Sequence, residues 1–112
     1  MNVVNLFGTV GSVERKEIGD NVLLEISVAT SWSKKNQSGE WENFTDWHRC
    51  NYWRDRKISK GDKVAIVGEL KTDKWQDKDG NNRYKTYVQV RSLEVVAKID
   101  PANLQPSDDL PF

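Results

Sequence analysis

Side chains that hold metals or form disulfides are scarce in this sequence. Among 112 residues there is one cysteine, Cys50, and one histidine, His48. A lone cysteine cannot form an internal disulfide, and these two residues cannot supply the three or four ligands of a zinc site. We therefore expect no metal ion and no other cofactor.

Long apolar runs are also missing. No stretch approaches the roughly 18 consecutive apolar residues of a membrane-spanning helix, and residues 1–5, MNVVN, do not resemble the start of a secretory signal. A protein with these properties is expected in the reducing cytoplasm, without membrane contact.

An overall excess of charge is absent too, because 17 basic residues balance 17 acidic ones. The balance is uneven along the chain. All 17 basic residues precede residue 100, whereas three acidic residues, Asp100, Asp108 and Asp109, follow residue 99 with Pro101, Pro106 and Pro111. This pattern predicts a mildly basic domain over residues 1–97 and a flexible acidic tail over residues 98–112.

Aromatic residues, in contrast, are concentrated in the segment 44–53, FTDWHRCNYW, which has four rings and no glycine or proline. Such a composition predicts a β-strand. Alternation places Trp47, Arg49 and Trp53 on one face and His48 and Cys50 on the other. Two indoles with a guanidinium between them suit a solvent-exposed surface better than a core.

Four further strands are predicted from periodicity and turn residues. Gly8 and Gly11 indicate a bend or bulge in the first strand, and the sequence Asp79-Gly80 favours a hairpin before the last. The five strands are expected over residues 3–13, 22–32, 44–53, 63–75 and 83–96. We predict an all-β fold, a five-stranded Greek-key barrel of the oligonucleotide-binding type with long hairpins and little or no helix. An open antiparallel sandwich is the alternative.

Exposed rings interleaved with cations are what a single-stranded nucleic acid requires, because bases stack on rings and phosphates attract Lys and Arg. The alternative is that the tryptophans are ordinary core or rim residues. The residues predicted to contact nucleic acid are Lys34, Lys35, Trp47, Arg49, Trp53, Lys71, Lys74, Trp75, Arg83 and Lys85. Trp32 joins this set only through a family resemblance, which the following motifs carry.

Several motifs together resemble the bacterial-type single-stranded DNA-binding proteins. They include Asp46-Trp47-His48-Arg49, the hairpin of residues 74–80, KWQDKDG, and Lys60-Gly61-Asp62. The resemblance implies that Trp47, Trp53 and Trp75 stack on bases, with Trp53 where the family commonly has phenylalanine. Two departures are a missing short helix between the third and fourth strands and a short linker before the tail. They suggest a compact variant of the kind a phage or plasmid encodes.

The same resemblance implies partners. It predicts a homo-oligomer, with a tetramer favoured and a dimer possible, and places His48 at a subunit contact together with Val3 and Val4. The C-terminal residues Asp108, Asp109, Leu110, Pro111 and Phe112 resemble the family's acidic tip, which recruits replication and repair proteins. A terminal ring and carboxylate suit a partner's apolar pocket and basic clamp.

Two other functions remain to be weighed. An enzyme would need clustered carboxylates or a nucleophile with a base, and Asp77 and Asp79 lie in a turn without a partner histidine. We therefore expect no catalysis. A barrel that serves mainly as an adaptor in a primosome-like assembly, with weak strand binding, is the alternative to a protein that coats and protects single strands during replication, recombination and repair.

Overall fold

A computed structural model describes residues 1–98, and this part of the chain folds into five strands with no helix. The strands are β1 (Val4–Ile18), β2 (Asn21–Lys35), β3 (Trp41–Tyr52), β4 (Lys63–Gln76) and β5 (Asn82–Ala97). They close a barrel in the order β1-β2-β3-β5-β4. The predicted all-β barrel is confirmed.

Strand β1 makes closure possible because it pairs with two neighbours. Its first part, to Thr9, pairs with β4, and its second part, from Thr9, pairs with β2. The register shifts between Val10 and Ser12, at Gly11. The bulge predicted from the glycines is therefore present, and it turns the strand from one neighbour to the other. A short parallel pairing of β3 with β5 at Cys50 and Asn51 completes the barrel.

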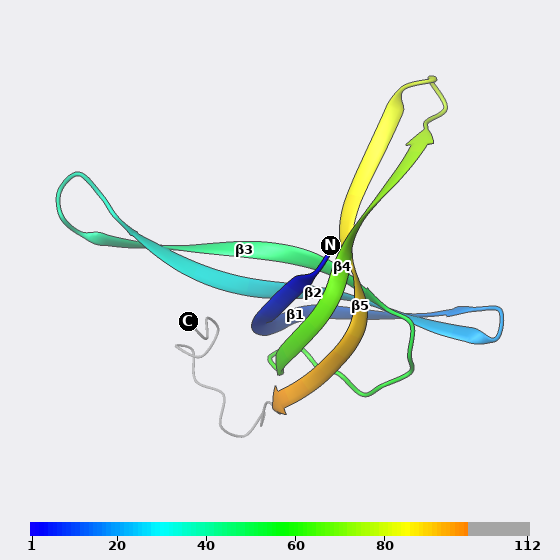
Figure 1. Cartoon of the computed structure of the whole chain (residues 1–112), viewed down its shortest axis with the longest axis horizontal. Helices are drawn as coiled ribbons and strands as arrows, with labels where there is room; N and C mark the ends of the chain where they lie inside the picture. The colour runs from blue at the N-terminus through cyan, green and yellow to red at the C-terminus, as the bar shows by residue number, and fades with distance from the viewer. Residues whose placement is uncertain (99–112) are drawn as a thin grey trace.

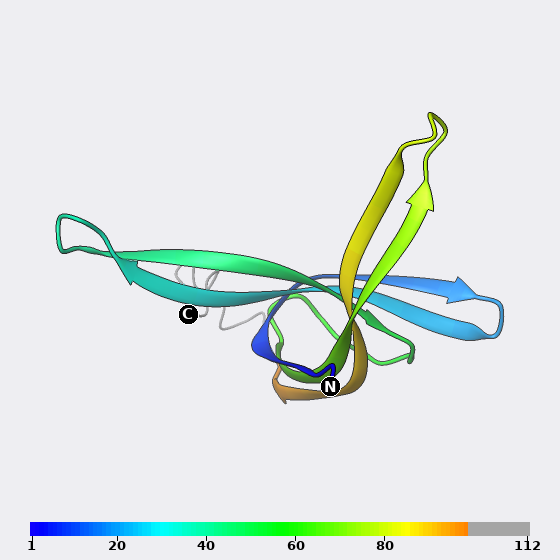
Figure 2. The ribbon, with the colours of Figure 1, turned by 45° about the horizontal axis from the view of Figure 1, so that its top comes forward.

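Three long hairpins leave the barrel in different directions (Figure 1). The β1–β2 and β2–β3 hairpins point to opposite sides, and the β4–β5 hairpin rises between them; the turned view in Figure 2 shows the same three arms. Gly39 and Gly80, with φ of 82° and 79°, lie in the turns of the second and third arms. These left-handed conformations suit glycine.

The strands differ from the predicted ranges mainly because the arms are longer. The segment 33–35 was expected to be loop, but β2 continues to Lys35, which pairs with Trp41 on β3. Both faces of the arm are wet, so polar residues fit a strand there. Trp53 was predicted within the third strand, yet β3 ends at Tyr52 and Trp53 begins the loop to β4.

The core lies between the inner faces of the strands. Fully buried side chains include Leu24 and Val28 from β2, Ile66 from β4 and Leu93 from β5. Cys50 also lies there, and burial raises the pKa of its thiol to about 12, so it is an unreactive core residue.

Asp62 anchors the end of the β3–β4 connection although its side chain is completely buried. Its carboxylate accepts a hydrogen bond from the Ser59 backbone N–H at 2.9 Å and from Lys98 Nζ at 2.7 Å. The prediction assigned Lys98 to the tail, but this ion pair fixes it to the barrel. A buried carboxylate needs such partners to remain charged.

Candidate nucleic-acid interface

The outer side of β3 presents an indole and a cation to solvent. Trp47 is 59% exposed and Arg49 is exposed on the same face, as alternation predicted. The six-membered part of the Trp47 ring lies directly over Gly11 of β1, where a Cβ atom would overlap it. The absence of a side chain at Gly11 therefore makes room for the Trp47 ring, which remains 59% exposed.

The β4–β5 arm continues this arrangement. Trp75, 48% exposed, pairs across the hairpin with Arg83, and Lys71 and Lys85 lie on the same face by alternation. We call the surface formed by Trp47, Arg49, Lys71, Trp75, Arg83 and Lys85 the outer face.

A recess joins the two arms of the outer face. It has a volume of about 190 Å³ and is lined by residues of β1, β2, β3 and β5, among them Ser12, Ser27, Arg49 and Lys85. Arg49 and Lys85 are distant in the sequence, and barrel closure brings them together. Neither forms an ion pair within residues 1–98, so both cations are free to neutralise phosphate.

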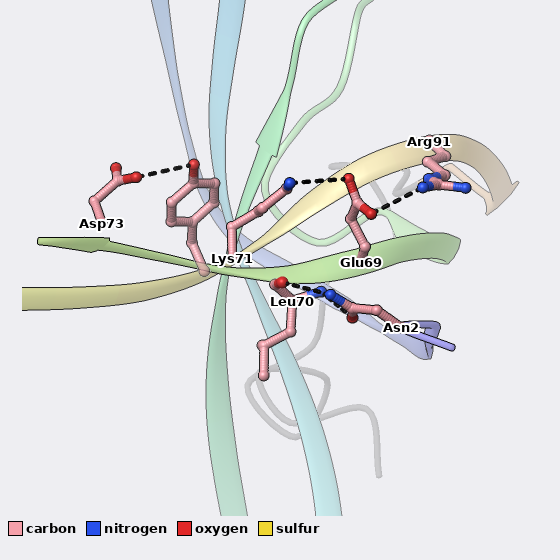
Figure 3. A network of polar contacts seen from close by, with 7 residues as sticks. Asn2, Glu69, Leu70, Lys71, Asp73 and Arg91 are labelled. Carbon is pink, nitrogen blue, oxygen red and sulfur yellow. Dashed lines mark hydrogen bonds and ion pairs between the residues drawn. The ribbon is translucent and has the colours of Figure 1, made fainter.

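Other cations of the outer face are paired with acids. Figure 3 shows Glu69 between Lys71, at 3.5 Å, and Arg91, at 2.8 Å. The hydrogen bond from Arg91 is the main cause that lowers the pKa of the Glu69 carboxyl. Arg83 is held 2.9 Å from Asp77. These cations must exchange an internal carboxylate for a phosphate before they contribute to binding.

Trp32, Lys34 and Lys74 lie on the opposite faces of their hairpins from Trp47 and Trp75. Trp32 shares the parity of buried Val28 and stacks on Phe44, with ring centroids 4.5 Å apart and an interplanar angle of 21°. One face of the Trp32 ring is thus occupied, although the side chain is 46% exposed. Lys35 shares the parity of Trp47 and extends the outer face toward the hairpin turn.

Comparison with known proteins assigns this barrel to a family. The profile of the single-strand binding protein family matches residues 1–96. The chain belongs to this family. A single-stranded DNA-binding protein of Rhizobium meliloti is 35% identical over 99 residues, which cover 79% of this chain and 56% of the relative. The chain therefore spans little more than half the length of that relative.

Solved structures share the fold of this family member. The Plasmodium falciparum SSB in complex with ssDNA superposes with a TM-score of 0.72 at 24% identity, covering 84% of this chain and 91% of the other. A deletion mutant of the Thermus aquaticus single-stranded DNA-binding protein gives 0.70 at 20% identity, covering 84% of this chain and 49% of the other. The family assignment and the oligonucleotide-binding barrel are both confirmed.

Two exposed rings of this family member were not singled out in the sequence. Trp41 is 69% exposed and has the parity of Trp47, so alternation counted back from Trp47 would have found it. Tyr84 is 62% exposed and has Lys74 Nζ 5.9 Å from its ring centroid. Lys74, Trp75, Asn82 and Tyr84 line a second recess near the end of the β4–β5 arm.

The residues predicted at a subunit contact have different surroundings. His48 is half-buried, and its Nε2 lies 2.8 Å from Thr30 Oγ1 on the inner side of the β2–β3 arm. Val3 is 54% exposed, whereas Val4 packs against the core. Val3 is therefore the more exposed of the two valines, and Val4 is partly buried.

Carboxylates in the β4–β5 turn have a structural role. Asp77 Oδ1 accepts hydrogen bonds from the Asp79 and Asn81 backbone N–H groups, and Oδ2 accepts one from Arg83. The Asn81 bond is the main cause that lowers the pKa of Asp77.

Within residues 1–98 no three His, Cys, Asp or Glu side chains gather to hold a metal ion, and no helix there is long and apolar enough to span a membrane.

The predicted partner-binding residues, which all lie in the tail, are outside the described part of the chain; they are Asp108, Asp109, Leu110, Pro111 and Phe112.

Trp53, predicted to contact nucleic acid, lies at the start of the β3–β4 loop and is 46% exposed. That loop is connected to β1 through Arg15, whose guanidinium donates two hydrogen bonds to Asp55, at 3.1 and 3.0 Å.

Proposed function

We propose that this protein binds and protects single-stranded DNA without sequence specificity, as its family membership suggests. The observation that carries the proposal is the outer face, where exposed Trp47 and Trp75 flank the free cations Arg49 and Lys85. Rings that stack on any base, combined with cations that neutralise any phosphate, give affinity without base readout. Replication, recombination and repair are the processes that expose such strands.

A titration with long oligo(dT) at about 0.05 and 0.3 M salt tests this function. Tryptophan fluorescence should be quenched on binding, and log affinity should fall linearly with log salt. Arg49→Met should reduce the slope by about 0.7, the value for one contact to a single-stranded phosphate. Affinity that is weak and independent of salt would overturn the proposal and favour an adaptor.

We extend the proposal to a homo-oligomer that shares one DNA strand among subunits, preferably a tetramer, with a dimer as the alternative. Support comes from large apolar side chains on the outside of the barrel. Val3, Phe7 and Val67 are 54%, 57% and 43% exposed, and Phe7 and Val67 lie on paired strands β1 and β4. Such side chains are suited to burial against another subunit.

The substitution His48→Tyr is expected to weaken self-association. His48 is half-buried against Thr30, and the larger phenol ring must move outward into a packed subunit contact. Sedimentation at decreasing micromolar concentrations should show earlier dissociation than in the parent. Tyr84→Phe, which alters an exposed ring near the end of the β4–β5 arm, is the control and should leave the oligomer unchanged. Identical sedimentation of His48→Tyr and the parent would remove His48 from the interface.

We also propose that the acidic C-terminal tip recruits replication and repair proteins. The support is sequence chemistry, since Asp108 and Asp109 precede a terminal Phe112. Aspartates steer the tip toward a basic surface, and the ring of Phe112 fits an apolar pocket.

A further inference from the structure

An acidic residue lies in the recess that contains the free cations of the outer face. Glu25 of β2 lines this recess together with Arg49 and Lys85, and Glu14 of β1 also lines it. Cross-strand pairing puts Glu25 opposite Asn51 on β3 and opposite Glu14 on β1. A carboxylate beside two cations that are to bind phosphate works against that binding.

The Glu25 carboxylate is held in place and ionised. Lys16 Nζ lies 2.8 Å from Glu25 Oε1, and the Glu25 side chain is 31% exposed. The hydrogen bond from Lys16 lowers the pKa of Glu25, and the charges of Lys85 and Arg49 lower it further. The same hydrogen bond with Glu25 raises the pKa of the Lys16 ammonium group, and the charge of nearby Glu14 raises it further. At neutral pH the recess therefore holds a fixed negative charge.

This charge differs from the acids elsewhere on the outer face. Glu69 and Asp77 form ion pairs directly with Lys71 and Arg83, so those carboxylates occupy the cations themselves. Glu25 instead pairs with Lys16 and leaves Arg49 and Lys85 without a contact partner. Glu25 acts on these two cations only through electrostatic attraction at longer range, which salt screens. The same carboxylate repels a phosphate that enters the recess.

We propose that Glu25 limits the affinity of the outer face for single strands, as an internal anion that offsets the attraction of Arg49 and Lys85 for a phosphate. Its function is to keep bound DNA releasable. A coating protein must give up its strand when the strand is copied or paired, and a partly neutralised recess lowers the barrier to release. The proposal rests on the single-strand binding function proposed above and assigns a residue that tunes it.

The test is Glu25→Gln, which keeps the size of the side chain and an oxygen that can accept the Lys16 hydrogen bond. Affinity for oligo(dT) at about 0.05 M salt should rise roughly three- to tenfold, as expected for removing one charge a few ångströms from the contact. Log affinity should also fall more steeply with log salt than in the parent. Slower dissociation should account for most of the gain.

Glu94→Gln is the matched control because it removes the same charge from an exposed site on β5 opposite Ala65, on a different part of the barrel. It should change affinity less than twofold. An equal gain in both variants would mean that only net charge matters and would overturn the role of Glu25. Unchanged or weaker binding by Glu25→Gln would overturn it as well.

Inorganic polyphosphate separates this proposal from the function on which it rests. It offers phosphates without bases, so Glu25→Gln should bind it more tightly than the parent even if base stacking fails. If the parent does not bind oligo(dT), the proposed function is wrong, while the polyphosphate comparison still decides the role of Glu25. If Glu25→Gln and the parent bind polyphosphate equally, Glu25 does not limit phosphate binding.

Discussion

Replacing either Trp47 or Trp75 with alanine is expected to weaken oligo(dT) binding by about 1–3 kcal/mol, or roughly five- to 150-fold, because each ring stacks on a base. Both side chains are about half exposed, so the losses should come from the complex and not from unfolding. Fluorescence titrations measure the affinities, and circular dichroism melting curves check that the barrels remain intact.

Trp47→Phe is the control for this experiment. It keeps a flat ring over Gly11, so most of the affinity should remain. Parent-like affinity in both alanine variants would contradict stacking on the outer face. A loss in Trp32→Ala as large as in Trp47→Ala would show that the strand also contacts the other face of the β2–β3 arm, where Trp32 stacks on Phe44.

Gly8→Ala and Gly68→Ala are each expected to lower the free energy of unfolding by about 1–3 kcal/mol. A Cβ atom on Gly8 would overlap the carbonyl oxygen of Ala29, and one on Gly68 would overlap that of Gln89. Both obstacles are backbone atoms of neighbouring strands, so no rotamer change relieves the overlap and the strands must separate. Urea denaturation of the parent and each variant provides the measurement.

Gly11→Ala gives the contrasting result. Its Cβ atom would meet the Trp47 ring, which can move because it is a side chain at the surface. We expect a smaller loss of stability, together with a shifted tryptophan emission and weaker oligo(dT) binding. Equal stability losses at Gly8, Gly11 and Gly68 would mean that glycine flexibility, and not close approach, decides the cost.

Alternation along single strands allowed much of the outer face to be predicted. The parity of Trp47, Arg49 and Cys50 depends only on the direction of successive side chains in an extended chain, and the structure agrees with it. The strand ends were less predictable. Residues 33–35 are polar, which is typical of loops, and only pairing with β3 makes them part of an arm.

The cations of the outer face differ in their partners, and for some of them those partners are distant in the chain. Lys71, Arg83 and Lys85 look equivalent in the sequence, yet Glu69 holds the first, Asp77 holds the second, and the third lies free beside Arg49. Lys98, predicted in the tail, is ion-paired with buried Asp62. Glu69 and Asp77 are near neighbours of Lys71 and Arg83 in the chain, whereas the surroundings of Lys85 and Lys98 depend on distant segments.

The sequence by itself determined the class of fold, the five strands, the exposed ring and cation of β3 and the family, because these follow from local periodicity and from the order of short motifs. Only the tertiary structure decided that β3 and β5 run side by side and that Arg49 and Lys85 share a recess with Glu25. It also decided that Trp32 and Trp47 lie on different faces of the β2–β3 arm. The physical reason is closure. The register of a barrel is set by all of its strands together, so Arg49 and Lys85 meet only where β3 and β5 pair.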